Sequence, residues 1–214
     1  MTRKTFIAMC ALLLASAAAS VIFYPAFPEE YASHWNMAGE VDDTMPKSTG
    51  ALFMPGIMLV LLGLYALIPR IDPLKENLEK FRRAYDLLWL ALFSFFAYVH
   101  ALTLFWNLGG RFSFVRFLTP AFAVLWYVIG VVLARSRRNW FVGIRTPWTL
   151  ASDDVWNDTH AFGAKLFKAT AVVSLLGVFL PAPYVFWFIV APVLLTSLAT
   201  VLYSYLAWRR RAKR

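Results

Sequence analysis

The chain reads RNWFVGIRTPWTLASDDVWNDTHAFGAKL over residues 138–166, a polar stretch rich in Gly, Pro and Trp between long apolar segments. A plain connection between two helices needs only a handful of residues. The polar stretch is far longer and carries turn and capping signals of its own. We therefore interpret it as a functional element set between membrane-spanning helices.

Hydrophobic residues make up 60% of the 214 residues, above the roughly 45–50% of soluble domains. Four of six apolar runs have about the ~20 residues that cross a bilayer, and the sixth is longer. The fifth reaches that length only by including residues 161–168. The runs are 5–24, 51–68, 87–106, 117–134, 169–180 and 184–208. We predict an all-α, polytopic membrane protein with six transmembrane helices.

Basic residues indicate how these spans are oriented. If the chain crosses six times, 18 of its 21 Lys and Arg residues fall on one side, and the other side has only Lys47, Arg111 and Arg116. Positive charge is retained in the cytoplasm, so we expect both termini to be cytoplasmic, with the protein in the cell membrane. The topology thus accounts for the net charge of +9, and binding to nucleic acid is not needed to explain it. The lipid bilayer is the expected partner.

These patterns divide the chain into four segments. Residues 1–70 form an N-terminal two-span unit with an outer loop, and residues 71–116 hold an amphipathic cytosolic helix and the third span. Residues 117–208 form the unit around the polar stretch, and residues 209–214 form a basic cytosolic tail. The start of the chain resembles a signal peptide, but its apolar run continues through Tyr24, which favours an uncleaved span. The single cysteine, Cys10, lies in this span and is assigned to packing.

The outer loop, residues 25–50, combines prolines, aromatic residues and carboxylates. Pro25 and Pro28 predict a rigid turn after the first span, and Gly39 permits a second turn that brings acids near a histidine. We consider a recognition surface for a ligand or peptide toxin, a set of residues at the membrane interface, and a metal-dependent enzyme site. The recognition residues are His34, Trp35, Asn36, Gly39, Glu40 and Asp42. The metal alternative uses His34, Glu40 and Asp42, whose spacing matches no strong metal motif.

A short amphipathic pattern precedes the third span. Asp72 and Pro73 resemble an N-cap and a first helical residue. The apolar positions that follow recur at helical spacing and predict a helix running into the third span. They are Leu74, Leu78, Phe81 and Tyr85. This stripe either packs on lipid and neighbouring helices or docks a soluble partner.

Local signals predict the shape of the polar stretch. Gly143 permits a positive-φ turn, and Pro147 holds Thr146 extended. Ser152 is a predicted N-cap, with two aspartates in the first turn of the following helix.

Charged and aromatic side chains of the polar stretch have candidate roles as well. Arg145 is expected to pair with Asp153 or Asp154 at the helix start. The alternative is that Arg138 and Arg145 both anchor the chain to lipid headgroups. The tryptophans of the stretch are expected at the membrane interface; they are Trp140, Trp148 and Trp156.

Two histidines are candidates for function within the spans. His160 shares a helix face with Trp156 and a small glycine, where another helix can approach closely, and a hydrogen-bonded packing role is the alternative. His100 lies in the third span, where it either bonds to Thr103 or Asn107 as a neutral imidazole or relays protons. We find no nucleophile–base pair, phosphate cradle or HExxH-type zinc motif in the sequence. We therefore predict no enzymatic activity, no cofactor and no metal.

The polar stretch resembles the signature of the SdpI family, bacterial membrane proteins named for an immunity protein against a sporulation-delaying toxin. The matching residues are Asn139, Gly143, Ile144, Arg145, Thr146, Pro147, Trp148, Thr149, Leu150, Val155, Trp156, Thr159, His160, Phe162, Gly163, Lys165 and Leu166. The outer loop resembles the short N-terminal domain of unknown function that often accompanies this signature. Its matching residues are Pro25, Pro28, His34, Trp35, Asn36, Gly39, Glu40, Asp42 and Lys47. Ala164 departs from the pattern, since a second glycine is common there.

This resemblance implies an integral membrane protein that gives immunity to a secreted, membrane-active peptide toxin at its outer face. It further implies a signal-receiving role, in which the inner face captures a cytosolic repressor. The inner binding residues it assigns are Asn139, Gly143, Arg145, Thr146, Pro147, Trp156 and His160. A hypothesis of another class, a small transporter or proton-coupled channel using His100 and His160, stays open at this point.

Overall fold

The computed structural model describes residues 2–212, and this range contains six helices long and apolar enough to cross a membrane. They are α1 (Arg3–Phe23), α2 (Lys47–Ile71), α4 (Arg82–Asn107), α5 (Phe114–Leu133), α7 (Asp153–Leu176) and α8 (Ala182–Ala212). The shorter elements are α3 (Lys75–Lys80), α6 (Pro147–Ala151), the 3-10 turns η1 (Tyr24–Ala26) and η2 (Gly177–Phe179), and the strands β1 (Glu30–Trp35) and β2 (Val41–Pro46). The predicted all-α class with six transmembrane helices is confirmed. The chain is a multi-pass membrane protein.

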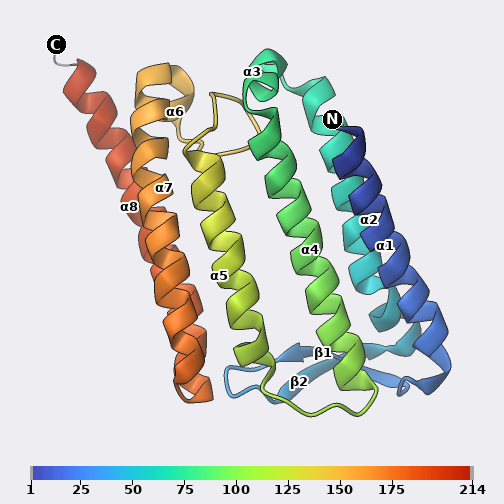
Figure 1. Cartoon of the computed structure of the whole chain (residues 1–214). Coiled ribbons are helices and arrows are strands. Elements are labelled where there is room, and N and C mark those ends of the chain that lie inside the picture. Colours follow the sequence, from blue (N-terminus) through green and yellow to red (C-terminus); the bar gives the residue numbers. More distant parts are fainter. Residues whose placement is uncertain (1, 213–214) are drawn as a thin grey trace.

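The long helices stand side by side, and the connecting elements divide between the two ends of the bundle (Figure 1). One end holds α3, α6 and both ends of the described chain, and we call it the termini end. The other holds the hairpin of β1 and β2, and we call it the hairpin end. The hairpin and α6 therefore lie on opposite sides of any membrane that these helices cross.

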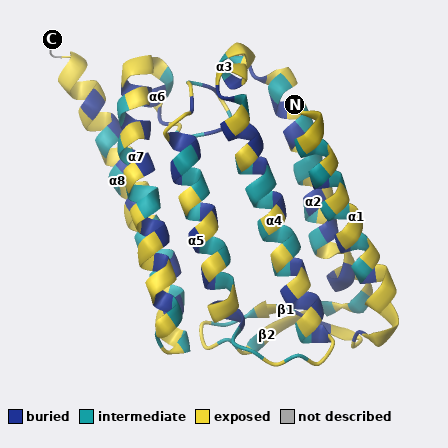
Figure 2. Ribbon diagram, viewed as in Figure 1, coloured by how far each residue is buried: buried dark blue, intermediate teal, exposed yellow. Residues whose placement is uncertain are grey.

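The helices pack as two groups that meet where α4 contacts α5. In the first group, α1, α2 and α4 share a core that includes Met9, Met58, Trp89 and Phe93. In the second group, α7 packs between α5 and α8. Large apolar side chains elsewhere face outward, such as Leu14, which is 68% exposed, and the long helices carry buried and exposed residues in stripes (Figure 2). Exposed apolar stripes on spanning helices are surfaces for lipid.

The amphipathic helix before the third span differs from its prediction. It is short, because the backbone breaks at Phe81 between α3 and α4. The carboxylate of Asp72 accepts a hydrogen bond from the Leu74 N–H at 2.7 Å, so it caps the turn that precedes α3. The stripe residues Leu78, Phe81 and Tyr85 are buried in the core of the first group. This burial agrees with the expectation that the stripe packs on neighbouring helices. The three buried residues are therefore not available to dock a soluble partner.

The hairpin is a feature that the sequence did not predict, since its polar residues do not alternate with apolar ones. Strands β1 and β2 pair antiparallel with irregular register around His34. The turn is closed by a bond from the Asn36 N–H to the Glu40 carbonyl oxygen at 2.9 Å, and Gly39 has φ 85 as expected. The buried Tyr31 ring packs over Gly50, where a Cβ would overlap it. Burial also raises the pKa of Tyr31 above its ordinary value, so this anchor is a neutral phenol.

One amide side chain ties the hairpin to the third span. Asn107, at the end of α4, accepts a hydrogen bond from the Ala32 N–H at 2.8 Å and donates one to the Ala32 carbonyl oxygen at 3.1 Å. It therefore gives β1 the two bonds that another strand would supply. Because Asn107 is buried, water does not replace these bonds readily.

We expect Asn107→Leu to release the hairpin while leaving the helices folded. The substitution leaves the buried N–H and carbonyl of Ala32 unpaired, which costs about 1–3 kcal/mol. Hydrogen exchange of residues 30–46 measures the effect as faster exchange. Thr119→Val is the control, because the Thr119 hydroxyl bonds only to the carbonyl of Val115 within α5. Equal protection of the hairpin in both variants would contradict the proposed role of Asn107.

Candidate functional site

The polar stretch folds around the buried side chain of Asn139. Its Oδ1 accepts hydrogen bonds from the N–H groups of Phe141 (2.9 Å) and Val142 (2.6 Å). Its Nδ2 donates to the carbonyl oxygens of Arg137 and Val142, both at 2.8 Å. One amide thus satisfies four backbone groups of an irregular loop.

His160 and Gly143 form the next contact, between the loop and α7. The N–H of Ile144 donates to His160 Nε2 at 2.9 Å, so Nε2 carries no proton. The Nδ1–H then donates to the carbonyl oxygen of Trp156 at 2.7 Å, and the two rings stack with centroids 4.0 Å apart. Both ring nitrogens hold backbone groups, which agrees with the hydrogen-bonded packing role.

Gly143 is required at its position for two separate reasons. Its φ is 128°, a backbone conformation that residues other than glycine rarely adopt. A Cβ built there would lie 2.5 Å from His160 Nε2 and 3.0 Å from the Trp156 ring. Trp156 is fully buried, so its expected place at the membrane interface is wrong: it serves as the wall against which the Gly143 turn closes.

A capping box fixes the following turn and links it to α8. Thr146 Oγ1 accepts a bond from the Thr149 N–H at 3.2 Å, and the Thr146 N–H donates to Thr149 Oγ1 at 2.9 Å. Thr146 is extended, as Pro147 predicts, and its hydroxyl also donates to Ser204 Oγ of α8 at 3.0 Å. Helix α6 itself was missed, although Thr before Pro with Thr three residues on is its start signal. The expected N-cap at Ser152 is present at the start of α7.

The predicted ion pair at the start of α7 involves a different arginine. Arg138 Nε lies 2.7 Å from Asp153 Oδ1, and Arg138 Nη1 donates to the carbonyl oxygen of Leu150. Arg145 instead donates to the carbonyl oxygen of Trp140 at 2.8 Å. The expected Arg145–aspartate pair is therefore wrong, because Arg138 already occupies that position. Arg145, Pro147 and Trp140 remain exposed, and they form the accessible surface of the loop.

Two polar residues outside the stretch hold it against the first group. The Trp140 N–H donates to Asp72 Oδ2 at 3.2 Å. Asn77 Nδ2 donates to the carbonyl oxygen of Arg138 at 2.8 Å. Sequence reasoning had no signal for either contact, because these residues lie more than sixty positions from their partners.

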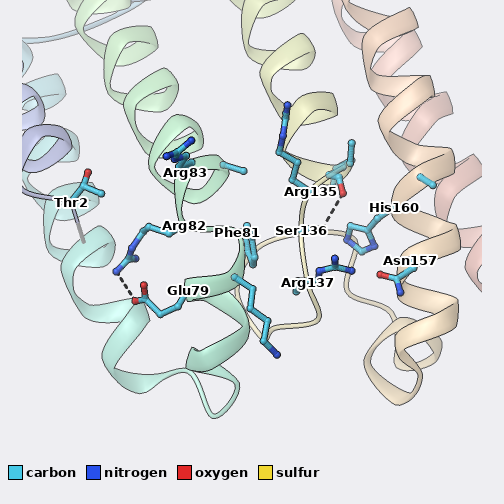
Figure 3. Close-up of a pocket in the computed structure, with 15 residues that line it drawn as sticks. Thr2, Glu79, Phe81, Arg82, Arg83, Arg135, Ser136, Arg137, Asn157 and His160 are labelled. Atoms are coloured by element: carbon cyan, nitrogen blue, oxygen red, sulfur yellow. Dashed lines mark hydrogen bonds and ion pairs between the residues drawn. The ribbon is translucent and has the colours of Figure 1, made fainter.

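A basic cavity of about 870 Å³ opens beside this loop, between the start of α4, the end of α5 and α7 (Figure 3). Its lining includes Lys80, Arg82, Arg83, Arg135 and Arg137, against a single carboxylate, Glu79. His160 and Asn157 line its α7 side. The cavity was not predicted, since its arginines come from segments that are far apart in sequence.

At the hairpin end, the predicted outer residues do come together. His34 Nδ1 lies 2.6 Å from Asp42 Oδ1, with side chains 67% and 41% exposed. Glu40 accepts a bond from Asn36 Nδ2 at 3.2 Å, so it does not join His34 and Asp42. Within residues 2–212, no three His, Cys, Asp or Glu side chains gather as a metal site would require.

Aromatic stacking gives this outer patch a rigid base. Trp35 stacks face to face on Phe114 of α5, with centroids 3.7 Å apart, and meets Trp106 of α4 edge-on. The hairpin therefore rests on both helix groups. Its exposed polar residues are held in place before any ligand arrives.

His100 makes contacts other than those predicted. Its Nε2 lies 3.0 Å from Ser20 Oγ and 3.1 Å from the carbonyl oxygen of Ser16, both on α1. Thr103 and Asn107 instead bond to the carbonyl of Val99 and to the hairpin. The prediction of those two partners for His100 is wrong, because α1 packs closely on this face of α4. His100 thus joins two helices of the first group.

Two family models match the chain: the SdpI/YfhL protein family over residues 135–204 and the domain of unknown function DUF1648 over residues 11–59. The chain is also similar to the "Immunity protein SdpI" of Bacillus subtilis (strain 168), with 22% identity over 187 residues, which is 87% of each chain. No solved structure matches the chain. The first model covers the loop, α7 and most of α8, and the second covers most of α1, the hairpin and the first half of α2.

Gly143→Ala is expected to destabilise the protein more than Gly109→Ala. Both glycines have positive φ, so each alanine adds strain of about 1–3 kcal/mol. Only the new Cβ at 143 also overlaps His160 and Trp156, whereas open space surrounds Gly109. Thermal unfolding of the purified proteins in detergent measures the difference. Equal losses would show that contact with His160 does not hold the loop.

Proposed function

We propose that the chain is an immunity protein of the bacterial cell membrane that protects against a secreted peptide toxin, because the SdpI/YfhL family model matches residues 135–204. The similarity to an immunity protein over 87% of both chains supports this function. The structural observation that carries it is the rigid, exposed acidic patch on the hairpin. A membrane-active peptide that approaches from outside meets this patch first.

The direction of the bundle in the membrane is part of the proposal. The basic residues at the end of α2, in α3, at the start of α4, in the α5–α6 loop and at the end of α8 all belong to the termini end. Since positive segments are retained in the cytoplasm, we assign the termini end to the cytosol. The hairpin then faces outward.

The hairpin surface suits a cationic or amphipathic peptide. Exposed carboxylates at Glu30, Glu40, Asp42 and Asp43 lie on the two strands and their turn. Their fixed positions on the Trp35 base lower the entropy lost on binding. Acidic charge also attracts a cationic partner over several ångströms.

At the cytosolic end, we propose that the exposed residues Trp140, Arg145 and Pro147 bind a cytosolic partner such as a repressor. Of the remaining predicted residues of the stretch, Asn139, Thr146, Trp156 and His160 are buried and Gly143 is half-buried. We assign them to holding the loop in the shape that presents the exposed residues. In this proposal, the segment of residues 1–70 carries the outer patch and the segment of residues 117–208 carries the inner loop.

Cysteine labelling tests the assigned direction. We expect an impermeant maleimide to label Met37→Cys in intact cells, because Met37 is 46% exposed at the hairpin turn. Arg145→Cys and the control Arg210→Cys are expected to react only after the membrane is opened. The natural Cys10 is replaced by Ser in all three. Labelling of positions 37 and 145 from the same side would overturn the topology.

A survival assay tests immunity. Expression of the chain in a bacterium sensitive to the sporulation-delaying toxin is expected to raise survival, and unchanged killing would count against the function. Glu40→Gln with Asp42→Asn is expected to remove most of this protection, because the outer patch loses two charges. Glu76→Gln with Glu79→Gln removes two charges at the opposite end and is expected to keep it. Equal survival of the two double variants would exclude the acidic patch as the toxin-binding surface.

A further inference from the structure

We propose that the chain binds one anionic phospholipid in a crevice between α4 and α5, with the headgroup in the basic cavity and an acyl chain in an adjoining apolar groove. This site is independent of the immunity proposal. The proposal is based on the positions of the basic cavity and the apolar groove, which both lie between α4 and α5.

The basic cavity has cations that the protein does not neutralise. Arg82 pairs with Glu79 at 2.8 Å, yet its Nη1 is buried without a hydrogen-bond partner in the described chain. Arg83, Arg135 and Arg137 make no ion pair with residues 2–212. Arginine forks bind phosphate oxygens in pairs. A phosphate group would satisfy donors from both helices.

The apolar groove, of about 500 Å³, runs along the same two helices. Its walls come from α4 and α5 alone, and apart from Ser94 and the Tyr98 hydroxyl they are apolar. The lining residues are Leu87, Leu90, Ala91, Ser94, Phe95, Tyr98, Pro120, Ala121, Val124, Leu125 and Val128. Several remain exposed, including Val124 at 61%, so the groove opens toward lipid.

Helical spacing joins the two hollows into one path. On α4, Arg83 lines the cavity and Leu87, four residues later, lines the groove; residues four apart lie on one helix face. On α5, Val128 lines the groove and Leu133, the last residue of the helix, lines the cavity; Arg135 lines the cavity from the turn that follows α5. The path from Arg83 to Tyr98 is about 22 Å at ~1.5 Å per residue. This exceeds the ~15 Å that one leaflet contributes to the hydrocarbon core, so an acyl chain fits along it.

The identity of the bound molecule follows from the combination of a basic cavity with an apolar groove. A soluble anion would use the cavity and leave the groove empty. An uncharged lipid would use the groove and leave three arginines without counter-charge. An anionic phospholipid uses both.

Native mass spectrometry of the full chain in detergent tests the site with phosphatidylglycerol and phosphatidylcholine of matched acyl chains. We expect phosphatidylglycerol to bind more tightly. Arg83→Ala with Arg135→Ala is expected to weaken its binding on the order of tenfold. The control Arg209→Ala with Arg210→Ala removes two charges at the same end but outside the cavity, and is expected to change little. Equal binding of the two lipids, or equal loss in the two double variants, would overturn the proposal.

The acyl part of the site is tested separately. Ala121→Trp fills the groove, whereas Leu195→Trp adds the same bulk to a position of α8 that is 66% exposed and lies outside the groove. Only Ala121→Trp is expected to reduce binding of long-chain phosphatidylglycerol. Thermal unfolding of each variant verifies that it is folded. Unchanged binding to folded Ala121→Trp, or equally tight binding of glycerol phosphate alone, would show that the cavity binds a phosphate group without the lipid chain.

Discussion

Backbone amides and carbonyls that leave a helix beside a membrane must find partners within the protein, because lipid offers none. Two asparagine side chains meet this demand, one at each end of the bundle. Asn107 bonds to both backbone groups of Ala32 in the hairpin. Asn139 bonds to the backbone of Arg137, Phe141 and Val142. An amide is suited to this role because it donates and accepts at once.

This arrangement separates the residues that hold a loop from those that face outward. In the polar stretch, the Gly143 turn closes on His160 and Trp156, and the Thr146 cap bonds to Ser204. These residues are largely buried and account for the shape of the loop. In the proposed function, recognition by a partner falls to exposed neighbours such as Arg145. A residue pattern that identifies a family can therefore describe a scaffold more than a binding surface.

The sequence predicted the spans and several turns, which depend on near neighbours, but it missed two local elements, the hairpin and α6. Span lengths follow from runs of apolar residues, and the turns at Gly39 and Gly143 follow from the freedom of glycine. Contacts between distant segments were missed or wrong. Asn107 and Ala32 are 75 residues apart, and Thr146 and Ser204 are 58 apart. Likewise, nothing in the spacing shows that Arg138 rather than Arg145 reaches Asp153, because that choice depends on the path of the whole loop.

The seam between the two helix groups connects these findings. At the hairpin end, Trp35 of β1 closes the seam by stacking on Phe114 of α5. At the termini end, Asp72 and Asn77 of the first group bond to the loop that follows α5. Between these closures lie the basic cavity and the apolar groove. A signal from an outer ligand to the inner loop needs two arrangements of these groups, and the proposed lipid occupies the place where they would move against each other.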